Sequence, residues 1–248
     1  MTTVKNIYDY INSIAPYDTQ EEWDNSGHIL GDFRAEVKKV VMALDATRQA
    51  AIFAKETGAQ LVLTHHPVIF GSISDVKADT AVYDFVSNKI NVLCAHTNFD
   101  KAQEGINENL AQILELENIQ RLEDGFTVAG NLKCEMSADD FVQLVSDRLY
   151  CQGIRYTDSD RIIKRIALCG GAGGDFIETA MANADCYLTG ELKYHEMLEC
   201  AEKGFCAISA GHFETENSAF LMLKEKLEKI FTDVEFIVAP NENPVHSI

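Results

Sequence analysis

Two adjacent histidines, His65 and His66, follow a short apolar run and stand directly before Pro67. The run Leu61 to Leu63 is typical of a buried strand, and proline lacks the backbone N–H needed to continue a central ladder. The strand is therefore expected to end at the two imidazoles. Since neighbouring side chains within a strand point to opposite faces, a strand end is where both rings can face one cleft. Imidazole is a common metal ligand, so the doublet is a candidate metal site.

Other side chains able to bind a metal or carry a proton also follow apolar runs of strand character. They are His96, Asp100, Glu191, His212 and Glu216. If a helix begins near His212, positions i and i+4 place His212 and Glu216 on one face. If the segment is extended, His212 pairs with Glu214 instead, and the sequence leaves both arrangements open.

The number and type of these side chains indicate which metal could bind. A site for one ion with an open position needs about three protein ligands. The five candidates His65, His66, Asp100, His212 and Glu216, with His96 in reserve, suit two ions about 3.5 to 4 Å apart. A mixed nitrogen and oxygen set without thiolates favours zinc, iron, manganese or nickel over calcium or magnesium.

A glycine-rich loop, Gly170 to Gly174, lies between a predicted strand and a predicted helix. Such a loop can present backbone N–H groups to a phosphate, or it can be a tight turn. The pattern G-x-G-x-x-G is not met, because Phe176 occupies the last glycine position, and there is no Walker A sequence. Both interpretations stay open.

Strands and helices alternate along the chain, which predicts an α/β fold. The helices are expected at residues 4–14, 48–57, 80–88 and 104–115, and the strands at 37–44, 59–64 and 91–95. The same order recurs from about residue 160, where strands are expected at 163–169, 184–189 and 205–210. We therefore expect an internal duplication in which Gly190-Glu191 occupies the place of His65-His66.

The duplication predicts two interlinked α/β domains, residues 1–124 and 125–248, around a shared metal-binding cleft. Open α/β sheets bind ligands at the carboxyl ends of their strands, where all the candidates fall. The second domain would contain a helix that begins after Ser137. The strand expected at residues 234–240 could pair with either half of the chain, including the first domain.

Composition limits the classes of function. The formal net charge of −18 and the pI near 4.7 disfavour a nucleic-acid partner, which Lys and Arg would have to bind. No apolar run approaches the length of a membrane span, and the first residues do not resemble a secretory signal. We therefore expect a cytoplasmic protein whose seven cysteines are reduced.

Six motifs in this order resemble the NIF-three-like family, whose bacterial members are called GTP cyclohydrolase I type-two homologues. They are Trp23-Asp-Asn-Ser-Gly, Leu44-Asp-Ala-Thr47, Thr64-His-His-Pro-Val-Ile-Phe70, Ala95-His-Thr-Asn-Phe-Asp100, Leu188-Thr-Gly-Glu191 with Tyr194-His195, and Gly211-His-Phe-Glu-Thr-Glu216. The resemblance covers nearly the whole chain and is closest to the short bacterial form. Ser26 and His28 depart from it, since the family usually has small or branched apolar residues there.

The resemblance implies a toroidal homohexamer with a dinuclear metal site that faces its interior. It implies His65, His66, Asp100 and His212 as ligands, with Glu216 bridging both ions. On this basis we expect a metal-dependent hydrolase that acts on a nucleotide-like or phosphorylated small molecule. His96 and Glu191 are its candidate proton carriers, and the glycine-rich loop is a candidate phosphate contact. The alternative is a non-enzymatic assembly that binds metal or delivers it to partner proteins.

Overall fold

The computed structural model describes residues 1–240 and 243–246. The chain folds into two compact units. The first unit comprises residues 1–105 and 220–242, and the second comprises residues 106–219 and 243–248. The chain therefore leaves the first unit after Gly105, builds the second, and returns at Phe220.

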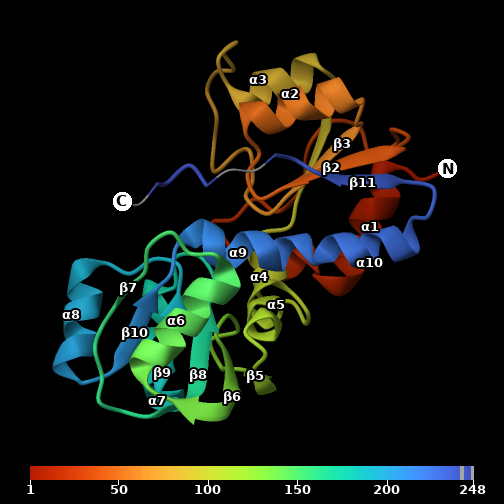
Figure 1. The fold of residues 1–248 in the computed structure, drawn as a ribbon. Coiled ribbons are helices and arrows are strands. Elements are labelled where there is room, and N and C mark those ends of the chain that lie inside the picture. The colour runs from red at the N-terminus through yellow and green to blue at the C-terminus, as the bar shows by residue number, and fades with distance from the viewer. Residues whose placement is uncertain (241–242, 247–248) are drawn as a thin grey trace. The chain divides into compact units, whose positions relative to one another are not determined.

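The first unit contains a five-stranded sheet with helices on both faces (Figure 1). The sheet order is β1-β4-β3-β2-β11, in which β1 is antiparallel to β4 and the other neighbours are parallel. The elements are α1 Val4–Ile14, the 3₁₀ helix η1 Tyr17–Thr19, β1 Gly27–Leu30, β2 Lys39–Ala43, α2 Arg48–Thr57, β3 Leu61–Thr64, α3 Ala81–Ser87, β4 Asn91–Cys94, α4 Thr97–Asp100, α10 Leu223–Ile230 and β11 Glu235–Val238.

The core of the first unit follows from strand alternation. Val41 and Ala43 of β2 point to the same face as Val62 of β3, and there they pack against Ala50 and Phe85 of α2 and α3. Neighbouring residues on these strands point to the opposite face and are also fully buried. Because both faces of this sheet are buried, its polar functional residues fall at the ends of the strands. The histidine doublet lies at such an end.

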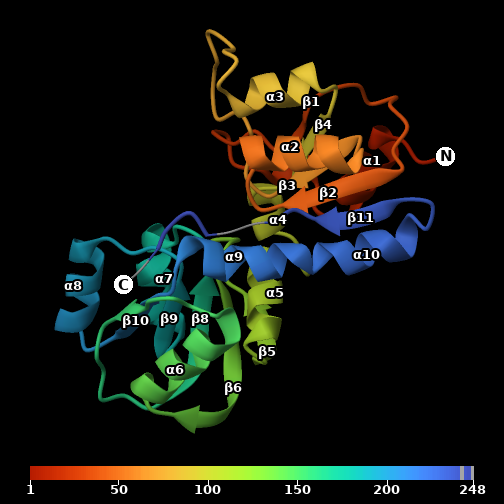
Figure 2. The same ribbon diagram turned by 45° about the horizontal axis from the view of Figure 1, so that its top comes forward.

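The second unit contains a six-stranded sheet in the order β5-β6-β8-β9-β10-β7. Helices α7 and α8 pack on one face, and α6 lies on the other (Figures 1 and 2). The elements are α5 Ile106–Ile113, β5 Glu117–Arg121, β6 Val128–Met136, α6 Ala138–Leu149, β7 Arg155–Tyr156, β8 Ile163–Cys169, η2 Gly174–Phe176, α7 Ile177–Asn183, β9 Cys186–Thr189, α8 Tyr194–Glu202, β10 Cys206–Ser209 and α9 His212–Leu221.

The two sheets repeat the same parallel arrangement. Strands β2, β3 and β4 lie side by side in the first unit, as β8, β9 and β10 do in the second. Each third strand also pairs with an antiparallel strand that precedes the repeat in sequence, β1 in one unit and β7 in the other. Thr64 and Thr189 are both the last residues of the middle strand. This shared topology supports the expected duplication, and the α/β fold class is confirmed.

The division between the units differs from the expected boundary after residue 124. Helix α5 and strand β5 lie before that residue, yet β5 pairs with β6 in the second sheet. Strand β11 lies far beyond it, yet it pairs in parallel with β2 of the first sheet. The difference arises because the edges of each sheet are completed by segments outside the repeat.

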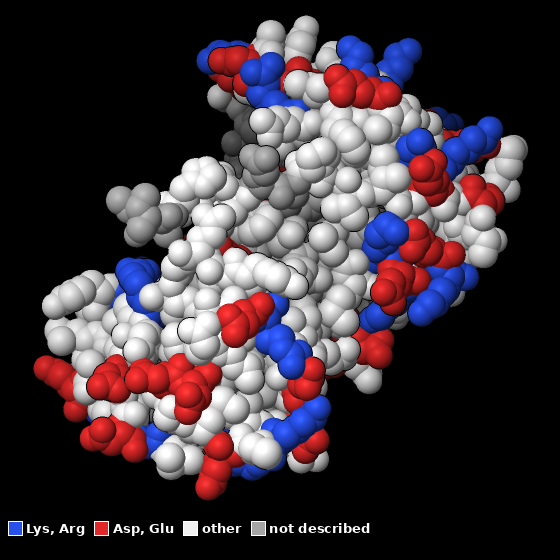
Figure 3. Space-filling model, viewed as in Figure 1, with Lys and Arg blue, Asp and Glu red and all other residues white. Residues whose placement is uncertain are grey.

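Acidic and basic side chains are interspersed on the face shown in Figure 3. Several basic side chains form ion pairs with acidic side chains of their own unit. Examples are Lys5–Asp9 and Arg48–Asp84 in the first unit and Arg148–Glu115 in the second. Among the described residues, no helix combines the length and the apolar character that crossing a membrane requires.

Candidate metal centre

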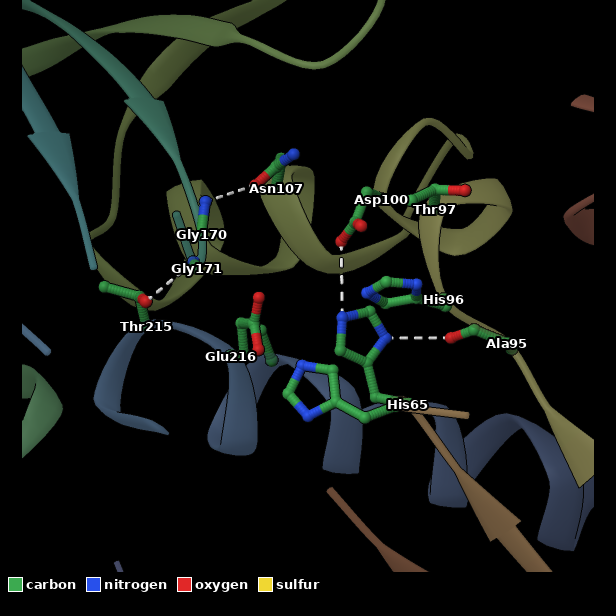
Figure 4. Close-up of polar contacts among 12 residues, drawn as sticks. His65, Ala95, His96, Thr97, Asp100, Asn107, Gly170, Gly171, Thr215 and Glu216 are labelled. Atoms are coloured by element: carbon green, nitrogen blue, oxygen red, sulfur yellow. Dashed lines mark hydrogen bonds and ion pairs between the residues drawn. The ribbon is translucent and has the colours of Figure 1, made fainter. Parts of the chain in front are cut away.

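His65 follows the last residue of β3 and is fully buried. Its Nδ1 lies 2.8 Å from the carbonyl oxygen of Ala95 (Figure 4). Because a carbonyl only accepts, Nδ1 carries the proton and Nε2 has the lone pair when the ring is neutral. Nε2 points to Asp100 of α4, whose Oδ1 is 3.5 Å away. The backbone thus fixes the tautomer in which His65 can act as a metal ligand.

His66 is oriented in the same way by a carboxylate. Its Nδ1 lies 2.7 Å from Oδ1 of Asp45, which stands two residues beyond the end of β2. Both backbone N–H groups of the doublet donate to the carbonyl oxygen of Leu44. The turn after β3 is therefore tied to the turn after β2, and Nε2 is the nitrogen through which His66 could coordinate a metal.

His96, directly after β4 and Ala95, is held by the buried carboxylate of Asp24. Its Nδ1 lies 2.8 Å from Oδ1, while Ser26 and Thr97 donate to Oδ2. Burial raises the pKa of Asp24, but the hydrogen bonds from His96 and Thr97 outweigh it and hold that pKa well below the usual range. Asp24 is therefore anionic at neutral pH and accepts a hydrogen bond from Nδ1–H of His96.

These three imidazoles converge within the first unit. His65, His66 and His96 each offer a ring nitrogen, and the three nitrogens lie within 4.8 Å of one another. The ring centroids are 5.0 to 5.4 Å apart. Three neutral imidazoles that are oriented through Nδ1 are a donor set typical of zinc and other divalent transition metals. The residues present therefore fit a bound metal ion.

The second unit orients His212 in the same manner. Its Nδ1 lies 2.8 Å from Oε1 of Glu191, and its Nε2 lies 3.1 Å from Oε2 of Glu216. Helix α9 begins at His212, so the helical alternative holds and the i, i+4 pair is His212 with Glu216. Glu214 accepts a hydrogen bond from Asn243 at 2.9 Å and is not the partner of His212.

The glycine-rich loop makes room for the carboxylate of Glu216. Gly171 has a φ of +64°, which favours glycine, and a Cβ built there would lie 2.2 Å from Oε1 of Glu216 and 3.2 Å from Nε2 of His212. A side chain at residue 171 would therefore displace the pair. The absence of a Cβ, and the left-handed turn that glycine allows, both serve the position of Glu216.

Three backbone N–H groups of the glycine-rich loop already donate to side chains. Gly170 donates to Oδ1 of Asn107 at 2.7 Å, and Gly171 donates to Oγ1 of Thr215 at 3.1 Å (Figure 4). Gly173 donates to Oγ1 of Thr189 at 3.0 Å. Three amides that a phosphate would need are bound to side chains, so the structure favours a tight turn over a phosphate-binding loop.

The structure thus brings His65, His66, His96 and Asp100 together in one unit, and Glu191, His212 and Glu216 together in the other. Asp24 and Asp45, which orient His96 and His66, had no role assigned from sequence. The signal that could have identified them is that each is the acidic residue within a family motif, Trp23-Asp-Asn-Ser-Gly and Leu44-Asp-Ala-Thr47. Glu191 accepts a hydrogen bond from Nδ1 of His212, and its role as a proton carrier stays a prediction.

The sequence model of Duf34/NIF3 (NGG1p interacting factor 3) matches residues 2–244 of this chain. A Clostridium perfringens protein named GTP cyclohydrolase 1 type 2 homolog is 34% identical over 250 residues, which cover 95% of each chain. A Helicobacter pylori protein named GTP cyclohydrolase 1 type 2 is 28% identical and covers 92% of each chain.

Solved structures share the fold. Staphylococcus aureus protein SA1388 superposes with a TM-score of 0.93 at 23% identity, covering 100% of this chain and 99% of its own. Reduced HcgD from Methanocaldococcus jannaschii gives a TM-score of 0.84 at 28% identity, covering 96% of this chain and 98% of its own.

Proposed function

This chain belongs to the Duf34/NIF3 family, and from that premise we propose that it is a metal-dependent hydrolase of nucleotide-like or phosphorylated small molecules. One observation carries the proposal. His65 and His66, two of the proposed ligands, and His96, the proposed proton carrier, are all oriented through Nδ1, and their ring nitrogens lie within 4.8 Å of one another. A merely structural cluster would not need three acceptors to fix three tautomers.

Two divalent transition-metal ions, of zinc, iron, manganese or nickel, are the proposed cofactor. The proposed ligands are His65, His66 and Asp100 of the first unit and His212 and Glu216 of the second. The family resemblance supports this set, as does the orientation of the imidazoles within each unit. Bound together, the two ions would lower the pKa of a water toward neutrality and polarise the bond under attack.

His96 is the proposed proton carrier. Asp24 accepts a hydrogen bond from Nδ1–H of His96 and stays anionic, so Nε2 of that ring can take a proton and the carboxylate stabilises the imidazolium that forms. Glu191 is proposed as a positioning residue for His212, because its carboxylate accepts the Nδ1 proton of that ring.

The names of the relatives suggest a first substrate. Because several are called GTP cyclohydrolase 1 type 2 or its homolog, we propose that the substrate carries a purine-like ring and that ring opening of a guanine nucleotide is one reaction to assay. Hydrolysis of a phosphoester is the other.

The test is to assay metal-loaded protein against GTP and a panel of phosphoesters. We expect His65→Ala and Glu216→Ala to lose metal and turnover together. We expect His96→Gln to keep its metal and to lose about 10²-fold or more in kcat, because only proton transfer is removed. Turnover at the wild-type rate in His65→Ala and Glu216→Ala would disprove a metal-dependent reaction.

A second function, metal binding and delivery to a partner protein, is supported by the imidazole triad of His65, His66 and His96. Three imidazoles within one unit can hold an ion through ligands of that unit alone. This function requires tight but exchangeable metal and no turnover on any substrate of the panel. Exchange of bound zinc with an added isotope, followed by mass spectrometry, measures the exchange directly.

The family resemblance also leads us to propose a homohexamer. Sedimentation velocity of the metal-loaded protein would give a species of about six times the 27.6 kDa chain mass. A monomer or dimer at the same concentration would exclude it.

A further inference from the structure

Two exposed aromatic rings lie at the imidazole triad. Trp23 is 61% exposed and Phe70 is 55% exposed. The ring of Trp23 is edge-on to that of His96, with centroids 5.9 Å apart and an interplanar angle of 74°. Phe70 meets the same imidazole at 5.6 Å and 86°. Both rings therefore contact the one proton carrier of the proposed site while keeping most of their surface open.

The backbone around both rings is held firmly. Trp23 immediately precedes Asp24, whose side chain is buried and accepts hydrogen bonds from His96, Ser26 and Thr97. The side-chain amide of Asn25 donates to the carbonyl oxygen of Ile69 at 2.8 Å, which joins the segment of Trp23 to the segment of Phe70. The two aromatic positions are thus fixed relative to each other and to His96.

The charges around Trp23 favour a neutral ligand. Glu21 and Glu22 directly precede it, and the cation near Glu21, Lys101, is already paired with that carboxylate. The formal net charge of the chain is −18. An anionic group would be repelled here unless metal ions bind it, whereas a planar heteroaromatic ring can stack on indole without a charge.

We infer that Trp23 and Phe70 form a recognition surface for a neutral, planar heteroaromatic ring of the purine nucleoside class, which they hold against His96. The inference rests on the proposed function and specifies the substrate class of that site. Stacking on an aromatic side chain is tolerant of the base, so the surface selects a flat ring over a sugar or an aliphatic chain. The ring is held beside the imidazole that would move the proton.

The chain contains one tryptophan, so its fluorescence reports on Trp23 alone. We would titrate the full chain with inosine, using ribose as the non-aromatic control, both after chelator treatment and after loading with zinc. Inosine is expected to quench the emission saturably in both forms, and ribose to leave it unchanged. Free N-acetyltryptophanamide corrects for absorption by the ligand.

Variants separate stacking from general packing, with calorimetry as the readout. Trp23→Ala is expected to weaken inosine binding about tenfold or more, because the stacked ring is lost. Trp23→Phe keeps a ring and should stay nearer to wild type, and Phe70→Leu should weaken binding. The matched control is Phe33→Leu, since Phe33 is also exposed and contacts a histidine, His28, with ring centroids 4.2 Å apart. This control should bind inosine as the wild type does.

Unchanged emission with inosine, or wild-type affinity in Trp23→Ala, would overturn the inference. If inosine does not quench and Trp23→Ala instead breaks the assembly into smaller species in sedimentation, the ring is a subunit contact and the inference fails. Binding at Trp23 without turnover on the substrate panel would leave the inference standing and reject the hydrolase. Turnover without quenching would support the hydrolase and reject the inference about Trp23.

Discussion

Each of the four histidines His65, His66, His96 and His212 has an oxygen atom within hydrogen-bond distance of its Nδ1, which leaves Nε2 as the nitrogen that could bind a metal or a proton. The acceptors are the carbonyl of Ala95 for His65, and the carboxylates of Asp45, Asp24 and Glu191 for His66, His96 and His212. A ring that can rotate or change tautomer would bind a metal more weakly. Binding would then have to order the ring and select the tautomer with its lone pair on Nε2. If these histidines bind metal as proposed, the orienting groups would matter for metal affinity although they would not contact the ion.

Asp45 provides the first test at this scale. We expect Asp45→Ala to lower zinc affinity about 10- to 100-fold, because His66 loses the acceptor that fixes its ring. Asp75→Ala is the control, since Asp75 is an exposed carboxylate of the same unit that pairs with Lys77. Competition with a chromogenic chelator measures both. Equal affinity in the two variants would show that Asp45 does not orient a ligand.

His28 provides a pH test. Its burial lowers its pKa below the ordinary value of 6.5, so the unfolded chain takes up this proton at a higher pH than the folded one. The contribution to the free energy of unfolding is complete above about pH 6.5 and falls as the pH drops from there toward the lowered pKa. The stability of the wild type relative to His28→Gln should therefore decrease between about pH 7.5 and about pH 5.5. Urea unfolding of metal-free protein measures this, and a constant difference would contradict it.

Much of the candidate site could be predicted from sequence because ligands at strand ends are local in sequence. His65, His66, His96 and Asp100 follow strands whose apolar character is plain, and the structure places them together. The roles of Asp24 and Asp45 could not be predicted from the residues alone. Asp24 and His96 are 72 positions apart and meet only because β1 pairs with β4.

At the scale of elements, α1 and α2 occupy the predicted residues because their apolar spacing and capping residues agree. Strand β6 was not predicted, because its second half carries exposed polar residues and lacks apolar alternation. Helix α9 begins at His212, which the sequence left open because the first turn of this helix consists largely of polar residues.

The loop after β8 gives a prediction at this scale. Gly171→Ala should cost about 1 to 2 kcal/mol for the left-handed backbone and should also weaken zinc binding, because its Cβ would displace Glu216. Gly58→Ala is the matched control, with a φ of +72° and open space around its Cβ. It should show a similar loss in stability at unchanged zinc affinity. Thermal unfolding and chelator competition measure the two quantities, and unaltered zinc affinity in Gly171→Ala would refute this role.

At the scale of the whole molecule, the first unit depends on residues from both ends of the sequence. Phe236 of β11 is 3% exposed and lies in the sheet of the N-terminal strands. Thr2 donates to Asp233 through both its backbone N–H and its hydroxyl, at 3.1 and 2.6 Å. A domain boundary drawn from an internal repeat cannot reveal this, because the strand that completes the sheet lies outside the repeat.

Two buried phenylalanines test the division of the chain. Phe236→Ala should lower the free energy of unfolding by about 3 to 5 kcal/mol and reduce hydrogen-exchange protection in β2, β3 and β4. Phe205→Ala, equally buried in the second unit, should instead reduce protection in β8, β9 and β10. Loss of protection in the second sheet alone after Phe236→Ala would contradict the assignment of β11 to the first unit.

The excursion of the chain between Gly105 and Phe220 also sets an order on biosynthesis. The ribosome delivers residues 106–219, nearly the whole second unit, before it delivers β11. Until then β2 is an exposed parallel edge, whose N–H and C=O groups can pair with the wrong strand. The nascent first unit therefore keeps one sheet edge open while the second unit, although made later, can already fold, and β11 covers that edge only after residues 106–219 have been made.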